Sequence, residues 1–476
     1  PRGKSMKSIS KNKEVKAIIH ALGLEVGNDY SKEENLDNIR YNKVIAYTDS
    51  DTDGFHIVGL LYNFLNYMYN DILKIPGFFS FARTPIMKVI YKQEKLVFYY
   101  LSLAKQFMKD NVVKNKKYYK GLGTSNTKDV REDFGKRIVD LVPDSETNTL
   151  IDNIFNSKKS EFRKNWITTF DPSKIKIIES EDNEIEQLSV STFINEEFIN
   201  FSIDDCKRSI PNIYDGLKES QRKILYAVFK RKLKYSGKSL KVAQLSGYVA
   251  EHTNYHHGED NLIDTIRGMT VRYVGSNNLP YFLNDGQFGT RLENSKDGAS
   301  GRYIFTKQEL YLRNLFPEID DDYLENNEDD GDIVEKKIYV PIIPMILVNG
   351  CIGIGTGFST DIPAYNPLTI IQWIREWIES GGTIFEDLGE GIIVCDGPDL
   401  IPWYRNFLGK VERIDNKILT YGMIEKSIKN KYIVKELPIG KKNWSIQKFK
   451  EKLEELLEKK VIKDFDNKSD EKNINF

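Results

Sequence analysis

The chain has 476 residues, and its 69 Lys and Arg against 70 Asp and Glu give a net charge of −1. This length suits about three or four domains, and the 40% apolar content excludes a wholly disordered or fibrous chain. Cys206, Cys351 and Cys395 lie far apart without a CxxC pair, so a disulfide framework is not supported and we expect a reducing compartment. The most apolar stretch, 339–358, is interrupted by prolines and glycines, so we expect a soluble intracellular protein with no membrane partner.

The first third of the chain alternates helix-like and strand-like segments. Residues 14–24 and 58–75 have helical patterns, and residues 43–47 form a short apolar run typical of a buried strand. This alternation predicts an α/β domain built on a parallel, Rossmann-like sheet. We expect the domain to end within residues 161–175 and to be followed by a polar linker.

A basic helical region begins after residue 193. Between residues 207 and 241 the chain has two acidic residues and eleven basic ones, namely Lys207, Arg208, Lys218, Arg222, Lys223, Lys230, Arg231, Lys232, Lys234, Lys238 and Lys241. Apolar residues at 224, 225, 228 and 229 predict an amphipathic helix within this region. The region is therefore a candidate surface for a polyanion. The acidic stretch 320–332 is interpreted as a solvated loop without a function.

Further helices are expected towards the end of the chain. A helical pattern covers residues 261–269, and a second helix is predicted from a cap at Asn366, through Pro367 in its first turn, to Gly381 past its end. A third is expected over 445–462. The chain contains no internal repeats.

Three carboxylates follow the strand predicted at 43–47. They are Asp49, Asp51 and Asp53, at alternating positions beyond the carboxyl end of the strand, where open α/β sheets carry their chemistry. Hard oxygen ligands in this number suit Mg²⁺. An EF-hand is excluded because its twelfth position, which needs Glu, is Leu60. A purely structural acidic turn is the alternative.

Several loops combine polar, aromatic and glycine residues. The loop KYYKGLGTS at 117–125 lacks the Walker pattern of a phosphate loop. The segment YHHGE at 255–259 contains two histidines but neither the spacing nor the cysteines of a typical zinc site, so DNA contact is favoured over zinc. Arg302 and Tyr303 lie in a glycine-rich segment, and Tyr303 alone is one of 26 tyrosines.

The order of these motifs is more informative than any one of them. TDSDTDGFHI, KYYKGLGTS, SIPNIYDGLKESQRKILY, YHHGE, VGSNNL, GQFGTR, KDGASGRYIF, YVPIIPMILVNG and GIGTG follow one another along the chain. In this order they resemble the DNA-cleavage core of the eukaryotic-type type IIA DNA topoisomerases (topoisomerase II), from Arg2 to about Leu437. The abundant Lys, Asn and Ile are typical of an AT-rich genome, such as that of a large DNA virus or a protist.

The resemblance implies an α/β and α+β multidomain protein. Its parts are a Toprim domain at 1–175, a linker at 176–200, a winged-helix domain with the catalytic tyrosine at 201–343 and a tower domain at 344–476. The expected location is the nucleus for a cellular protein, and the host cytoplasm, virus factory or virion for a viral one.

The resemblance also implies roles for individual residues. The expected catalytic residues are Tyr303, Arg302, His257 and Lys120. The expected ligands of Mg²⁺, for which Mn²⁺ or Ca²⁺ substitutes, are Asp49, Asp51 and Asp53. Ile354 is expected to wedge between base pairs of double-stranded DNA, and the other expected DNA contacts are Lys218, Arg222, Lys223, His256, Gln287 and Arg291.

Some features depart from the family pattern. Gly301 stands where relatives often have proline, and Phe55 where they have serine. The family's EGDSA segment, whose glutamate is a further metal ligand and proton acceptor, is expected before Arg2, and the ATPase, coiled-coil and exit-gate regions are absent from this sequence. We therefore expect ATP to act only through the missing region. The chain as given is expected to bind and bend DNA as a homodimer without completing a topoisomerase cycle.

The family reaction makes a transient double-strand break through 5′-phosphotyrosyl links so that another duplex can pass. A tyrosine with a pKa near 10 is only about one part in a thousand ionised at pH 7, so its attack needs a base or positive potential. Two alternative functions remain. A Toprim metal-dependent nuclease would share the aspartates but has no need of an Arg-Tyr pair, and a non-catalytic DNA-bending protein would bind without metal-dependent cleavage.

Overall fold

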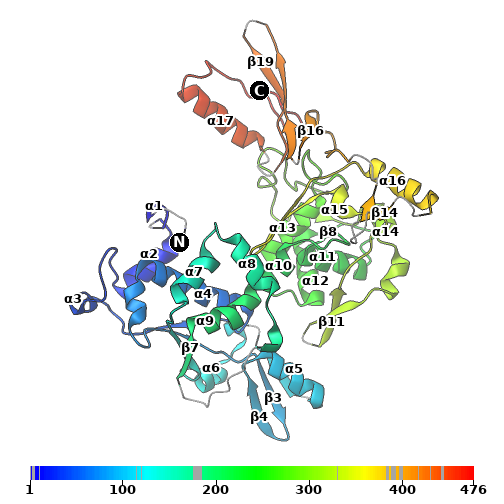
Figure 1. Cartoon of the computed structure of the whole chain (residues 1–476). Helices are drawn as coiled ribbons and strands as arrows, with labels where there is room; N and C mark the ends of the chain where they lie inside the picture. The colour runs from blue at the N-terminus through cyan, green and yellow to red at the C-terminus, as the bar shows by residue number, and fades with distance from the viewer. Residues whose placement is uncertain are drawn as a thin grey trace. The chain divides into compact units, whose positions relative to one another are not determined.

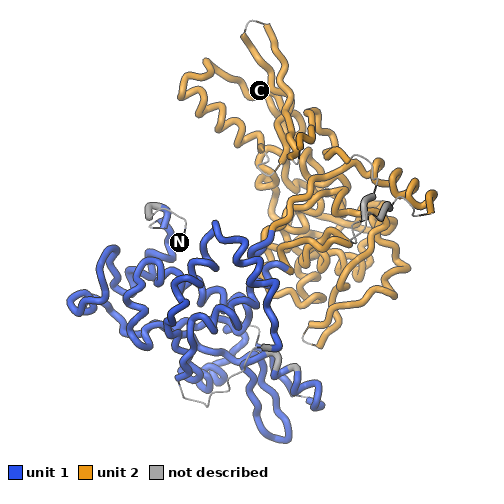
Figure 2. Tube along the Cα trace, viewed as in Figure 1, with its two compact units in different colours: residues 1–206, 355–358 blue, residues 207–354, 359–476 orange. Residues whose placement is uncertain are grey.

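The chain divides into two compact units in a computed structural model (Figures 1 and 2). The first contains residues 1–206 and 355–358, and the second contains 207–354 and 359–476. The structure describes residues 2, 6–9, 11–113, 115–119, 121–174, 185–329, 331–381, 385–387, 393–395, 400–415, 417–428, 430–440 and 444–476. Among these residues, no helix has both the length and the apolar character needed to span a bilayer.

A four-stranded sheet organises the first unit. Its strand order is β1 (Val44–Tyr47), β2 (Phe79–Ala82), β6 (Ile138–Val142) and β7 (Glu186–Ser189). β1 pairs with β2 and β6 with β7 in parallel, but β2 and β6 are antiparallel. The predicted sheet is therefore mixed rather than parallel. The chain between β2 and β6 forms a separate small sheet and a short helix instead of a single crossover helix, so β6 can return antiparallel to β2.

Helices cover this sheet and form the core of the unit. α4 (Thr52–Met68), α7 (Thr147–Phe155) and the π-helix η4 (Phe193–Phe198) contact one another or are joined through the same apolar cluster. The remaining elements are α1 (Met6–Ile9), α2 (Lys13–Leu22), α3 (Glu33–Leu36), η1 (Asn70–Lys74), α6 (Thr127–Asp133), α8 (Ser160–Thr168), η3 (Pro172–Lys174), α9 (Val190–Thr192) and α10 (Ile199–Ser209). The helices expected at 14–24 and 58–75 correspond to α2 and to α4 followed by η1.

A small antiparallel sheet carries the segment that begins KYYKGLGTS. Its order is β4 (Glu94–Phe98), β3 (Met87–Tyr91) and β5 (Asn115–Tyr118), and α5 (Leu101–Asp110) packs against it. β5 leads into the short helix η2 (Leu122–Thr124).

The linker predicted at 176–200 differs from what the described residues show. Residues 175–184 lie outside the described part, whereas residues 185–200 form β7, α9, η4 and the start of α10. Val190, Phe193 and Phe198 are buried in the core of the first unit. This part of the predicted linker is therefore integral to the first unit, because its apolar side chains complete the core.

Three helices form the centre of the second unit. α11 (Glu219–Lys230), α12 (Val242–Thr253) and α13 (Glu259–Thr270) pack around buried apolar residues that include Ile224, Val249 and Ile266. A two-stranded sheet of β8 (Leu240–Lys241) and β9 (Phe305–Thr306) lies beside them in the chain path. The helices predicted around 224 and over 261–269 are confirmed as α11 and α13.

Short hairpins and helices complete the second unit. They are α14 (Leu312–Leu315), η5 (Glu318–Asp322), β10 (Asn326–Asp329) with β11 (Asp332–Lys336), α15 (Met345–Val348), β12 (Cys351–Ile354) with β13 (Ser359–Ile362), α16 (Pro367–Glu379), β14 (Phe385–Asp387) with β15 (Ile393–Cys395), β16 (Lys410–Ile414) with β17 (Lys417–Tyr421), β18 (Met423–Lys426) with β19 (Tyr432–Glu436), and α17 (Ile446–Glu458). The acidic stretch 320–332, expected to be a loop, lies largely in η5 and the β10–β11 hairpin.

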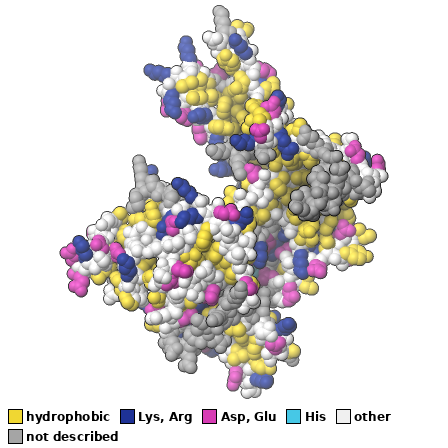
Figure 3. All heavy atoms as spheres, viewed as in Figure 1, with side chains coloured by type: hydrophobic (Ala, Val, Ile, Leu, Met, Phe, Trp, Pro, Cys, Tyr) yellow, Lys and Arg dark blue, Asp and Glu magenta, His cyan; other side chains and the backbone are white. Residues whose placement is uncertain are grey.

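Helix caps lie where the sequence predicts them. The Asn366 side chain accepts a hydrogen bond from the Leu368 N–H at 2.9 Å and caps α16, and Gly381 has a φ of +70° after its end. The Ser445 hydroxyl caps α17 in the same way. Near α17, β18 and β19 present exposed apolar side chains, and Lys and Arg side chains gather at this end of the unit on the face in Figure 3.

Candidate functional site

Tyr303 lies on a tight turn held between buried groups. The Ala243 N–H donates to the Gly301 carbonyl and the Val242 N–H to the Ile304 carbonyl, both at 3.0 Å. Gly301 and Ile304 are buried, but 68% of Tyr303 is exposed. The fold therefore fixes the backbone on both sides of the tyrosine and directs its phenol to solvent.

The neighbouring Arg302 provides a cation beside this phenol. Its guanidinium carbon lies 5.5 Å from the centroid of the Tyr303 ring, and its Nε donates to the Ser300 hydroxyl at 3.3 Å. A cation over an aromatic ring is attracted by the ring's quadrupole. Arg302 is exposed, so its charge can also reach an anion that approaches the phenol.

The two histidines of YHHGE lie in an exposed loop between α12 and α13. His257 Nε2 lies 3.2 Å from Nη1 of Arg208, and His256 Nε2 lies 3.4 Å from Oδ2 of Asp329. No local sequence signal indicated that the acidic β10–β11 hairpin would contact this loop, because the two segments are separated by more than seventy positions, 75 for the Asn254–Asp329 hydrogen bond.

Three predicted DNA contacts are buried and paired within the second unit. The Arg222 guanidinium binds Asp215 with Nε to Oδ2 at 2.8 Å. Lys223 Nζ donates to Glu335 at 2.9 Å, and Arg291 Nη1 lies 2.6 Å from Glu436 Oε1. All three cations, Arg222, Lys223 and Arg291, are at most 7% exposed. The prediction that they contact DNA does not fit this burial, since the fold already neutralises their charges.

The other predicted DNA contacts are accessible. Lys218 is partly exposed at the start of α11, and Gln287 is exposed at the edge of a cavity of about 800 Å³. Arg272, Arg405 and Lys435 also line this cavity. Sequence analysis missed these three cations because they come from separate segments and belong to no motif.

Ile354 ends strand β12 on the surface. β12 and β13 form an antiparallel hairpin in which Ile354 pairs with Ser359. Ile354 is 72% exposed. The alternative interpretation, that it is a buried strand residue, is therefore wrong.

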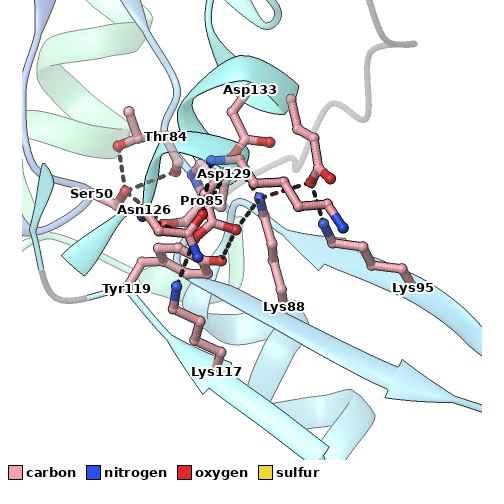
Figure 4. Close-up of polar contacts among 12 residues, drawn as sticks. Ser50, Thr84, Pro85, Lys88, Lys95, Lys117, Tyr119, Asn126, Asp129 and Asp133 are labelled. Atoms are coloured by element: carbon pink, nitrogen blue, oxygen red, sulfur yellow. Dashed lines mark hydrogen bonds and ion pairs between the residues drawn. The ribbon is translucent and has the colours of Figure 1, made fainter.

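In the first unit, the aspartates follow β1 on an alternating turn. The Ser50 hydroxyl donates to the carbonyls of Thr84 at 2.8 Å and Pro85 at 3.1 Å (Figure 4). This inward contact leaves Asp49 and Asp51 exposed on either side of Ser50. Asp51 caps α4 by accepting a hydrogen bond from the Gly54 N–H at 2.8 Å.

Asp49 also contacts the glycine turn that follows β5. Its Oδ1 accepts a hydrogen bond from the Leu122 N–H at 2.7 Å. A Cβ at Gly121 would lie 3.2 Å from the Asp49 carboxylate, so the close approach of the turn favours glycine there. Lys120, the predicted catalytic lysine, lies outside the described residues.

The aspartates match a hard divalent cation in the chemistry of their ligands, because carboxylate oxygens are what Mg²⁺ prefers. In the described part of the chain, however, no group of three or more His, Cys, Asp or Glu side chains is arranged to hold a metal ion. The three aspartates therefore supply ligands of the right kind without forming a complete binding cage by themselves.

Comparison with known proteins identifies the family. Residues 208–476 match the DNA gyrase/topoisomerase IV family model, and residues 82–206 match the C-terminal associated domain of TOPRIM. The first match covers more than half of the chain. The chain belongs to the type II DNA topoisomerases. The resemblance inferred from the motif order is thus confirmed.

Relatives place the match within this topoisomerase family. The chain is 39% identical over 486 residues to DNA topoisomerase 2 of Invertebrate iridescent virus 6, covering 98% of this chain and 41% of the relative. It is 38% identical over 484 residues to the mitochondrial DNA topoisomerase 2 of Dictyostelium discoideum, covering 100% of this chain and 36% of the relative. The chain thus spans less than half the length of these two topoisomerases.

A solved topoisomerase structure matches the entire chain. It is the crystal structure of the Plasmodium falciparum topoisomerase II DNA-binding, cleavage and re-ligation domain. The TM-score is 0.73 at 38% identity, and the match covers 100% of this chain and 63% of that one. The mixed α/β architecture is therefore that of a topoisomerase II cleavage domain.

The buried ion pair of α11 predicts a stability effect in this topoisomerase chain. We expect Lys223→Met to lower the free energy of unfolding by about 3–5 kcal/mol, because Glu335 would remain buried without its cation. Lys230→Met, at an exposed position of the same helix, is the matched control and should change it by less than about 0.5 kcal/mol. Urea unfolding followed by circular dichroism measures both, and equal effects of the two variants would contradict the structural role of Lys223.

Proposed function

We propose that this chain cleaves and rejoins double-stranded DNA as the cleavage core of a type II DNA topoisomerase. The observation that carries the proposal is the exposed Tyr303 beside Arg302, on a turn whose flanking residues are buried. A phenol that is exposed but fixed in place can reach a phosphate that is too large to enter a pocket. Membership of the type II topoisomerases supports the same assignment.

In the proposed reaction, Tyr303 Oη attacks a backbone phosphorus and gives up its proton. A bond forms between this oxygen and phosphorus, the bond from phosphorus to the 3′ oxygen breaks, and the 3′ oxygen takes up a proton. The 5′ end is then held by a phosphotyrosyl link. Since one phosphodiester replaces another, the reverse attack by the 3′ hydroxyl rejoins the strand without outside energy.

Positive charge near Tyr303 lowers the cost of this attack. Arg302 and the Arg208–His257 pair supply cationic groups of the second unit for the crowded phosphate. We assign Lys120 a similar stabilising role on the basis of the family motif in which it lies. The proton acceptor is proposed to be the glutamate of the family's EGDSA segment.

We propose that Asp49, Asp51 and Asp53 hold Mg²⁺, with Mn²⁺ or Ca²⁺ as substitutes. A divalent cation bound there would neutralise charge on the phosphate and on the departing 3′ oxygen. Asp49 and Asp51 are exposed, which leaves their oxygens accessible to a cation together with water, DNA or a further carboxylate.

The proposed partners are duplex DNA and a second copy of this chain. Lys218, His256 and Gln287 are accessible groups that could bind the backbone, and Ile354 is placed to insert between base pairs. In the family, tyrosine and metal of one active site come from different subunits, so the proposed unit of action is a homodimer. Strand passage, which ATP drives in the family, is assigned to the whole topoisomerase.

Tyr303→Phe tests the nucleophile. We expect it to abolish covalent DNA attachment and to leave the DNA dissociation constant within about twofold, because affinity rests on phosphate contacts that the hydroxyl does not provide. The assay assembles the chain with a polypeptide that carries the EGDSA segment and recovers DNA joined to protein. Tyr214→Phe is the matched control, since Tyr214 is 67% exposed against 68% for Tyr303. Covalent complexes formed by the Tyr303 variant would disprove the assignment.

Asp51→Asn tests the metal ligands. Asparagine caps a helix as well as aspartate does, so α4 should remain intact while the charge is lost. We expect the Mg²⁺ concentration for half-maximal cleavage to rise about tenfold or more, with DNA binding preserved. Asp37→Asn, at another exposed position of the first unit, is the control. Unchanged Mg²⁺ dependence of cleavage in the Asp51 variant would exclude Asp51 as a ligand.

Ile354→Ala tests the wedge. Bending a short duplex costs about 1–6 kcal/mol, and an inserted apolar side chain stabilises the bent form. We therefore expect a smaller bend angle, measured by fluorescence energy transfer between the duplex ends. Ile333→Ala is the control because Ile333 is exposed to the same degree, 71% against 72%. An unaltered bend in the Ile354 variant would refute the wedge.

A further inference from the structure

Asp129, in the short helix α6, accepts hydrogen bonds from three different segments although it is buried. The Tyr119 hydroxyl donates to its Oδ1 at 2.9 Å, and Lys117 Nζ donates to its Oδ2 at 2.6 Å (Figure 4). The Asn126 backbone N–H donates to the same Oδ2 at 3.2 Å. Both oxygens of one carboxylate are thus used to hold the end of β5 and the start of α6.

The charge of this carboxylate is maintained by its surroundings. The hydrogen bond from Lys117 is the main reason that the pKa of the Asp129 carboxyl lies well below its usual range. Since the pKa is lowered, the stabilisation is complete at neutral pH and is lost only as the pH falls below the usual range of a carboxyl. Lys88 adds a second cation, with its Nζ 3.7 Å from Asp129 Oδ1 and 2.5 Å from Asp133 Oδ2.

The anchored residues lead directly to Asp49. Lys117 and Tyr119 are two positions apart at the end of a strand, so their side chains leave it on the same face, toward Asp129. Two residues beyond Tyr119, the Gly121 backbone approaches the Asp49 carboxylate, and the Leu122 N–H donates to Asp49 Oδ1 at 2.7 Å. A short chain path therefore connects Asp129 to one of the proposed metal ligands.

We propose that Asp129 is a positioning residue, which fixes the turn at 121–125 against Asp49 and so orients that carboxylate for metal binding. This inference rests on the proposed function, in which Asp49 is a metal ligand. A carboxylate that accepts one directed hydrogen bond is restricted in rotation, and its second oxygen is turned toward a defined direction. Asp129 touches neither DNA nor the proposed metal and acts through the turn.

Asp129→Asn is the informative variant. Its amide nitrogen is a donor, so one side of the group would face the donors Lys117 Nζ or Asn126 N–H without accepting from them. Asp129→Glu keeps both acceptor oxygens and should restore much of the function. Glu132→Gln is the matched control, because Glu132 lies on the same helix but pairs with Lys95 and Lys88.

The first readout is amide hydrogen exchange over residues 117–125 in the 476-residue chain, without DNA. We expect exchange to be about tenfold faster in Asp129→Asn and unchanged in Glu132→Gln. Exchange at the rate of the unsubstituted chain in a folded Asp129→Asn variant would overturn the anchoring. Equal acceleration by both variants would overturn it too, because the effect would then belong to the helix as a whole.

The second readout is the Mg²⁺ concentration for half-maximal DNA cleavage, measured with the EGDSA-bearing polypeptide added. We expect Asp129→Asn to raise it about tenfold, with DNA binding unaltered and Asp129→Glu closer to the unsubstituted chain. A loss of cleavage at unchanged Mg²⁺ dependence would reduce Asp129 to a purely structural role and overturn the proposal. Failure of the unsubstituted chain to form covalent complexes would instead refute the proposed function, and the exchange experiment would still decide the anchoring.

Discussion

A charged side chain acts on a polyanion only when the fold does not already neutralise its charge, and this constraint sorts the residues of the chain. Lys223 is buried against Glu335, and Arg291 against Glu436. Arg302 is exposed beside the phenol that we propose as nucleophile. With 69 basic and 70 acidic residues, the net charge says little about DNA binding. What matters is which cations remain available at the surface.

The same constraint applies to the carboxylates of the first unit. Asp129 is enclosed by the donors Lys117 and Tyr119 and serves the fold, whereas Asp49 is exposed and keeps an oxygen accessible. The two are linked through the turn that donates the Leu122 N–H to Asp49. An exposed acidic ligand is thus supported by a buried acidic anchor, and each needs the environment that the other lacks.

Local sequence signals predicted the local structure well. The caps at Asn366 and Ser445 and the apolar spacing of α11 depend on neighbouring residues only, so the helices formed as expected. Motif order identified the family. The burial of Lys223 could not be predicted, because its partner Glu335 lies 112 positions away in a hairpin that composition alone presents as a solvated loop. The antiparallel pairing of β2 with β6 also depends on a distant return of the chain.

The central claim is that Tyr303 forms the covalent link to DNA. The most direct measurement is mass spectrometry of the trapped covalent complex after digestion with nuclease and trypsin. Trypsin cleaves after Arg302 and Lys307, so the account predicts a nucleotide on Tyr303 in the peptide 303–307. A nucleotide on any other tyrosine of the 26, or on a residue of another type, would contradict it.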